Sequence, residues 1–152
     1  MSRRTFWVVV VVSACAAILL LGLGYSGDSP KRGQVEAQCN RAMVHAEKGE
    51  HDAANEDYTK AIELDPKCAK AYCNRADVHN RKGAHDKAIC DCSKAIGLDP
   101  RMPETYANRA EAYFCKRLYD KAWADVKTCR KLGGKVDPAF LAELRKASGR
   151  EE

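Results

Sequence analysis

The sequence lacks the motifs on which most enzymes depend. It contains no glycine-rich phosphate loop, no nucleophile and base at a recognisable spacing, and no set of cysteines and histidines spaced as metal ligands. We therefore expect no catalysis, no cofactor and no bound metal. His45 and His79 are one repeat apart, as are His51 and His85, and tyrosines follow at both positions, so we interpret the histidines as structural.

A basic stripe is also missing from the middle of the chain. Residues 35–100 contain ten Lys and Arg against twelve Asp and Glu, whereas residues 1–34 contain four against one and residues 101–152 twelve against eight. The net charge of +5 therefore lies at the two ends. Nucleic-acid binding needs positive charge along one face, so we expect no nucleic-acid partner.

The eight cysteines follow no recognisable disulfide pattern. Cys15 lies in an apolar run, which leaves seven, an odd number that cannot all pair internally. Cys90 and Cys92 are two residues apart and would point to different sides of a helix. We interpret the cysteines mainly as unpaired structural thiols, which suit a reducing compartment. One internal disulfide would also suit an oxidising compartment.

Residues 5–25 (TFWVVVVVSACAAILLLGLGY) contain no charged side chain. A helix of this length would span about 31 Å, which matches the apolar core of a bilayer. Three interpretations stay open: an uncleaved membrane anchor, a cleaved secretory signal, and a lipoprotein signal ending at Cys15. We favour a single-pass anchor in residues 1–25, because the apolar run continues past Cys15 and exceeds the core of an ordinary signal peptide.

The charges that flank this run define its orientation only weakly. Arg3 and Arg4 precede it, whereas Lys31 and Arg32 follow it, so the positive-inside rule slightly favours a folded domain outside the cytoplasm. Residues 26–34 (SGDSPKRGQ) show no periodic apolar pattern. We expect them to form a flexible tether between the membrane and the domain.

The rest of the chain repeats one segment three times. Asn-Arg-Ala occurs at residues 40–42, 74–76 and 108–110, so successive copies are 34 residues apart. In the first two copies, apolar and small residues at helical spacing are interrupted by Gly49 or Gly83. This period predicts stacked pairs of antiparallel helices, with Asp52 and Asp86 as N-caps of the second helices.

Five positions in each of the first two copies resemble the signature of the tetratricopeptide repeat. They are Gly49, Ala54, Tyr58, Ala61 and Pro66, followed by Gly83, Ala88, Cys92, Ala95 and Pro100. The resemblance implies an all-α, right-handed solenoid of helical hairpins, with repeats at residues 35–68, 69–102 and 103–136. The third repeat departs from the pattern, because Arg117 replaces the turn glycine. Residues 137–152 are expected to form a capping helix, starting at Asp137-Pro138, and a frayed tail.

Members of this family bind peptides in a concave groove lined by the first helix of each repeat. The resemblance therefore implies binding positions on these three helices, and we select Asn40, Met43, Asn74, Asp77, Arg81, Asn108, Glu111 and Phe114. The whole inner face carries five acids and two bases, which favours a neutral or basic segment as partner. The three asparagines suit pairing with the main chain of an extended peptide, or they only brace neighbouring helices.

We thus expect a non-enzymatic protein-interaction adaptor beside a membrane. The alternative is a structural or assembly subunit that buries its groove in a larger complex. A third hypothesis comes from family members that dock the terminal carboxylate of heat-shock proteins. Only Asn74 matches that carboxylate clamp, whose other positions hold Cys39, Met43, Glu104 and Asn108. We assign Arg41, Arg75 and Arg109 to packing or salt bridges.

Overall fold

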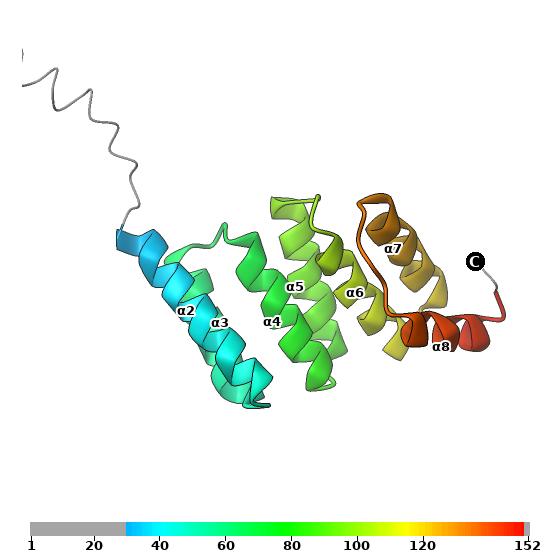
Figure 1. The fold of residues 1–152 in the computed structure, drawn as a ribbon, viewed down its shortest axis with the longest axis horizontal. Coiled ribbons are helices and arrows are strands. Elements are labelled where there is room, and N and C mark those ends of the chain that lie inside the picture. Colours follow the sequence, from blue (N-terminus) through cyan, green and yellow to red (C-terminus); the bar gives the residue numbers. More distant parts are fainter. Residues whose placement is uncertain (1–29, 151–152) are drawn as a thin grey trace, which may run out of the picture.

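The protein folds as a row of α-helices, seen in a computed structural model that describes residues 30–150 (Figure 1). The helices within this range are α2 (Pro30–Glu47), α3 (His51–Leu64), α4 (Ala69–Arg81), α5 (His85–Leu98), α6 (Pro103–Cys115), α7 (Tyr119–Lys131) and α8 (Pro138–Ser148). The predicted all-α solenoid of helical hairpins is confirmed. The predicted span at residues 5–25 lies outside the described range, and within that range no helix is long and apolar enough to cross a bilayer.

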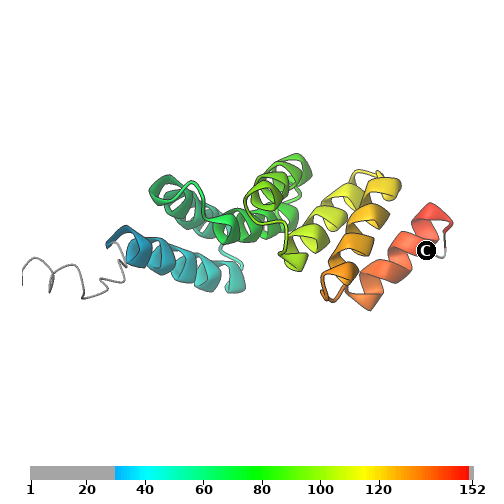
Figure 2. The same cartoon turned by 90° about the horizontal axis from the view of Figure 1, so that it is seen from above.

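The helices pair in chain order and the pairs stack along one axis (Figures 1 and 2). The pairs are α2 with α3, α4 with α5, and α6 with α7, and α8 closes the far end. The first helices of neighbouring pairs also contact each other, α2 with α4 and α4 with α6. The second helices of the described pairs make no comparable contact with one another. The row therefore curves towards α2, α4 and α6, which form its inner side.

Small side chains allow the helices within each pair to approach closely. Three sets of equivalent positions have at most 1% of their surface exposed: Ala42, Ala76 and Ala110; Ala54, Ala88 and Ala122; Ala61, Ala95 and Cys129. Interhelical distances of 8–10 Å depend on the side chains at the contact, so a larger residue here would push the helices apart. The repeated alanines thus explain why all three pairs adopt one geometry.

The turn inside each pair has the same backbone conformation, although its residue differs. Gly49 and Gly83 have φ of 78° and 72°, and Arg117 adopts φ of 60° at the third copy. The next amide donates to the carbonyl oxygen five residues earlier in each case, as Leu118 N does to Tyr113 O at 2.8 Å. The third copy therefore keeps the turn of the first two copies, with backbone strain at Arg117.

Two predictions about helix starts need correction. Asp52 and Asp86 are not N-caps, because α3 and α5 begin one residue earlier, after Glu50 and Ala84. Their carboxylates instead form ion pairs with Lys82 and Lys116 of the following repeat. The predicted cap at Asp137 is correct, since its Oδ1 accepts a hydrogen bond from the amide of Ala139 at 3.1 Å.

The prediction of a tether over residues 26–34 is wrong for residues 30–34, and residues 26–29 lie outside the described range. Helix α2 begins at Pro30, so residues 30–34 are helical, and Val35 is already buried against the core. Proline at the start of a helix costs no hydrogen bond, because the first amides of a helix have no intrahelical partner. The segment is polar because the first turn of α2 is exposed to solvent, and such a composition resembles that of a linker.

Replacing Arg117 with glycine should stabilise the protein. Glycine adopts positive φ without steric cost, so we expect a gain of about 0.5 to 1 kcal/mol after the added entropy of the unfolded chain is subtracted. Urea denaturation followed by circular dichroism measures the change. The reciprocal variant Gly83→Arg, at the equivalent turn, should lose stability. Equal effects of the two variants would contradict the strain at Arg117.

Candidate peptide-binding groove

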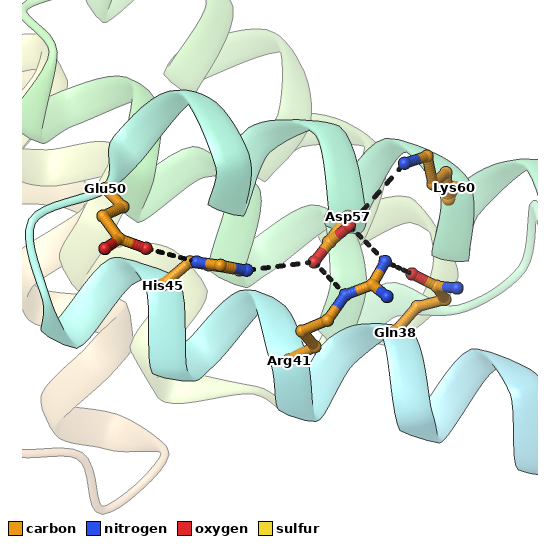
Figure 3. Close-up of polar contacts among 6 residues, drawn as sticks. All are labelled: Gln38, Arg41, His45, Glu50, Asp57 and Lys60. Carbon is orange, nitrogen blue, oxygen red and sulfur yellow. Dashed lines mark hydrogen bonds and ion pairs between the residues drawn. The ribbon is translucent and has the colours of Figure 1, made fainter.

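One arginine and one aspartate hold each helical pair at its centre. Arg41 donates two hydrogen bonds to Asp57, at 2.5 and 2.6 Å (Figure 3). The same bidentate pair recurs as Arg75 with Asp91 and Arg109 with Asp125, at 2.7 and 2.8 Å in both. The three aspartates are at most 6% exposed. The assignment of the arginines to salt bridges is confirmed.

The two later arginines also connect neighbouring repeats. Arg75 Nη1 donates to Thr59 Oγ1 of α3 at 3.0 Å, and Arg109 Nη1 donates to Ser93 Oγ of α5 at 3.2 Å. Arg41 instead donates its further bond to Gln38 of its own helix (Figure 3). Each of these two inner helices is thus fixed against the helix before it as well as against its own partner.

The histidines complete these polar centres. His45 Nδ1 lies 2.5 Å from Glu50 and its Nε2 lies 3.8 Å from Asp57, as Figure 3 shows. His79 Nε2 lies 3.6 Å from Asp91, and desolvation by burial lowers the pKa of His79. In the third pair Tyr113 occupies this position and lies under the Arg109 guanidinium, 5.8 Å from ring centre to Cζ. Their arrangement agrees with the structural interpretation of the histidines.

The inner side contains a cleft of about 190 Å³ between the first and second repeats. Four of the predicted binding residues line it: Met43, Asn74, Asp77 and Arg81. Ala46, Glu47 and Tyr58 also line it. Met43 is 39% exposed, so the cleft has an apolar wall open to solvent. The residues therefore surround one space rather than lie scattered over the surface.

Tyr58 also lines this cleft, although the sequence did not single it out as a binding residue. It is 2% exposed, and its hydroxyl is hydrogen-bonded to the side-chain amide of Asn74. Burial raises the pKa of Tyr58 to about 12, so the phenol stays neutral. The equivalent residues are Cys92 and Val126, which have no such hydroxyl. That loss of the tyrosine in later copies was the available signal for a cleft specific to the first junction.

The three asparagines of the predicted row have different surroundings. The side-chain amide of Asn108 donates to the backbone oxygen of Cys73 at 3.2 Å. The backbone oxygen of Asn108 accepts a hydrogen bond from Asn80 Nδ2 at 2.7 Å. Asn108 therefore braces α4 against α6. Asn74 is half-buried and bonded to Tyr58, whereas Asn40 is exposed on α2. Both interpretations of the row apply, at different positions.

Charge on the inner side is mainly negative around Asp77. Arg81 Nε donates to Asp77 at 2.9 Å, so this base is already paired within α4. Desolvation by burial raises the pKa of Glu111, and the nearby carboxylate of Asp77 raises it further. Glu47 on α2 is exposed beside the same cleft. The acids outnumber the bases, and the local potential favours a cation or a neutral group.

Phe114 does not line an open groove. Its ring meets Phe140 of α8 edge to face, with centroids 5.5 Å apart, and Tyr119 lies 6.0 Å away. The capping helix therefore covers this end of the inner side. A larger hollow of about 450 Å³ lies on α7, near Trp123, Lys127 and Arg150, and it is separate from the groove. Within residues 30–150, no group of three or more His, Cys, Asp or Glu is arranged to hold a metal ion.

The paired helices, the 34-residue period and the inner groove define a helical-repeat protein of the interaction-scaffold class. Residues 39–103 match the sequence model of the tetratricopeptide repeat. This match and the solved structures below support the tetratricopeptide repeat family for this chain. No curated protein matches it by sequence.

Solved tetratricopeptide repeat (TPR) domains share the whole array. The Arabidopsis OM64 TPR domain is 26% identical with a TM-score of 0.72, over 76% of this chain and 98% of that one. The first TPR of Spaghetti (RPAP3), bound to the HSP90 peptide SRMEEVD, is 25% identical with a TM-score of 0.71, over 77% and 92%. The second TPR domain of human RPAP3, in complex with the HSP70 peptide SGPTIEEVD, is 26% identical with a TM-score of 0.70, over 79% and 99%.

Removing the carboxylate of Asp91 should destabilise the array strongly. The Arg75 side chain is only 18% exposed, so Asp91→Ala leaves a charge that water solvates poorly, and we expect a loss of about 2 to 4 kcal/mol. The Asp57→Ala variant is the matched control, because its partner Arg41 is 53% exposed, and its loss should be smaller. Urea denaturation of both variants tests this order. A larger loss in Asp57→Ala would contradict it.

Proposed function

We propose that this protein is a non-enzymatic interaction module that binds an extended, neutral or basic segment of a partner protein along α2, α4 and α6. The observation that carries the proposal is the cleft formed by Met43, Tyr58, Asn74 and Asp77 on the inner side of the repeats. Related TPR structures in complex with peptides support binding of a protein segment in general. The class of segment is argued from this chain's own residues.

The electrostatics of the groove favour a partner that carries positive charge or none. Asp77 already contacts Arg81, and Glu111 stands close enough to Asp77 for its pKa to be raised. A lysine or arginine of the partner would reduce this repulsion between carboxylates. An acidic segment would add to it.

The shape and polarity of the cleft favour an extended main chain. Met43 offers a flexible apolar surface that adapts to different side chains. Asn74 has an amide that can both donate and accept beside it, as pairing with a peptide bond requires. Asn40 is exposed on α2 and can extend the same contact. Affinity would then come from the main chain, and selectivity from charge.

The same residues disfavour docking of acidic C-terminal peptides. The peptides in the RPAP3 complexes end in EEVD, which has three carboxylate side chains and the terminal carboxylate within four residues. In this chain Met43 and Glu104 stand at positions where such a clamp requires basic or amide groups. Arg81 lines the cleft, but it is paired with Asp77. The expected partner of this groove therefore differs in charge from the acidic peptides in the RPAP3 complexes.

Peptides with lysine or arginine should bind the full chain, purified in mild detergent, more tightly than matched peptides with aspartate or glutamate. Fluorescence anisotropy with pools of labelled short peptides measures the difference. Asp77→Asn should weaken binding of the basic pool roughly 5- to 10-fold, because one charge contact is lost. Asp120→Asn is the charge-matched control: Asp120 lies on α7 and pairs with Arg150, so its loss should leave affinity unchanged.

Two other results would redirect the proposal. Tight binding of SRMEEVD would contradict the charge argument and indicate chaperone docking. No binding of any pool to the folded protein would favour the structural or assembly subunit, whose groove is filled within a complex. Loss of binding at high salt, by contrast, is expected, because charge contacts at an open groove are screened.

Tethering to a membrane through residues 5–25 is part of the proposal. It rests on the length and apolar character of that run, which lies outside the described residues. The folded repeats would stand outside the cytoplasm if the slight positive-inside bias decides the orientation. The interaction module would then act on partners close to the membrane surface.

An uncleaved anchor predicts that the mature protein retains residues 1–25. Intact-mass spectrometry of the membrane fraction measures this directly. A mass that lacks the first residues up to about 24 would indicate a cleaved signal instead. A lipid-modified amino-terminal Cys15 would indicate a lipoprotein.

A further inference from the structure

Two thiols lie near the first junction of the array, one on α2 and one at the start of α4. Cys39 lies on α2 and is 7% exposed, and Cys68 is the N-cap residue of α4. Cys68 packs against the apolar cluster that contains Cys39, Val35 and Ala71. Each of the two side chains is the largest influence on the pKa of the other. Both cysteines are free thiols in this structure.

This contact is specific to the first junction. One repeat further along, Cys73 takes the place of Cys39, but Met102 takes the place of Cys68. Cys92 and Cys129 are buried at helix-packing positions, and Cys90 and Cys115 are exposed. The arrangement therefore does not follow from the repeat itself, whose second copy holds the same helices together without it.

The surroundings of the two sulfur atoms differ in a way that suits thiol chemistry. Hydrogen bonding with Cys39 lowers the pKa of Cys68 to about 6, and the amides of Ala71 and Lys70 at the start of α4 contribute, against the opposing effect of burial. The same hydrogen bond and burial raise the pKa of Cys39 far above its usual range. Asp65, Lys70 and Glu36 are the charged groups that face the pair. Cys68, which is partly exposed, is the sulfur that can attack.

We propose that Cys39 and Cys68 form a reversible disulfide that links α2 to the start of α4, with small-molecule disulfides of the glutathione type as the oxidant. The packing of Cys68 against the apolar cluster that contains Cys39, and the single occurrence of the pair, carry this inference. It is independent of the proposed peptide binding. It also provides the one internal disulfide that an oxidising compartment would favour.

The reaction proceeds by two exchanges. The thiolate of Cys68 attacks one sulfur of oxidised glutathione, which breaks that disulfide, forms a mixed disulfide and releases one glutathione thiolate. Cys39 then gives up its proton, its sulfur attacks the Cys68 sulfur, and the second glutathione leaves as a thiolate that takes a proton. Two protein thiols are oxidised and one molecule of glutathione disulfide is reduced to two thiols. Excess reduced glutathione reverses both steps.

The disulfide should form when the folded full chain, in mild detergent, is equilibrated with oxidised glutathione. The test uses a background in which Cys15, Cys90 and Cys115 are replaced by serine, so that none of these three thiols can exchange. After alkylation and tryptic digestion, mass spectrometry should find residues 33–41 joined to residues 68–70. Oxidation should also raise the melting temperature by about 10 °C, because the bond closes a long loop of the unfolded chain.

Three variants make the test specific. Cys39→Ser should stop at a glutathione adduct on Cys68, because the second attack is lost, and Cys68→Ser should form neither the adduct nor the link. Cys73→Ser, a buried thiol at the equivalent position of the second repeat, should form the link as before. Circular dichroism confirms that each variant is folded.

Two outcomes would overturn the proposal. One is the absence of the linked peptide from folded protein at saturating oxidised glutathione. The other is linkage of residues 33–41 to the peptide that contains Cys73, which would mean that the sulfur of Cys39 has a different partner.

Discussion

The bidentate pair between an arginine of the first helix and an aspartate of the second is the constraint on which the array depends. The alanines at the helix crossings allow close approach, but they slide easily because they are small and apolar. Arg75 and Asp91 fix both the rotation and the register of α4 against α5, since two parallel hydrogen bonds tolerate little displacement. The groove is a by-product of this arrangement: once the arginines face the second helices, Asn74 and Asp77 are directed to the inner side.

The groove is not uniform along the array, although its repeats are. At the first junction Tyr58 reaches Asn74 and leaves a cleft beside Met43. At the second junction Asn108 and Asn80 join α4 to α6, and Phe114 is packed below α8. The part of the inner side that offers a ligand both an apolar wall and polar side chains therefore lies in the amino-terminal half of the array. A short partner segment is enough to fill it.

The period and the residue types at repeated positions were sufficient to predict the helices, their pairing and the salt bridges of the arginines. They were not sufficient where contacts join non-equivalent positions. Phe114 was selected as a groove residue from the first helix of its repeat, but the last repeat has α8 packed against this ring. The cysteines were interpreted mainly as unpaired thiols, and the sequence did not show that Cys68, at the start of α4, packs against the cluster that contains Cys39. Asp52 and Asp86 were predicted as caps from local sequence, but distant lysines bind them.

The connections between repeats have a direction, and it gives the array a weak end. Arg75 and Arg109 each reach back to a hydroxyl of the preceding repeat, so the second pair of helices is held from both sides by such bonds. The last pair is closed by α8. The first pair is joined to the second through Thr59 and the Asp52–Lys82 ion pair, and Arg41 turns to Gln38 of its own helix. We therefore expect local opening of the native state to begin at α2 and α3, with amide protection that rises along the chain towards α8. The amino-terminal hairpin would then separate while the rest of the solenoid stays folded.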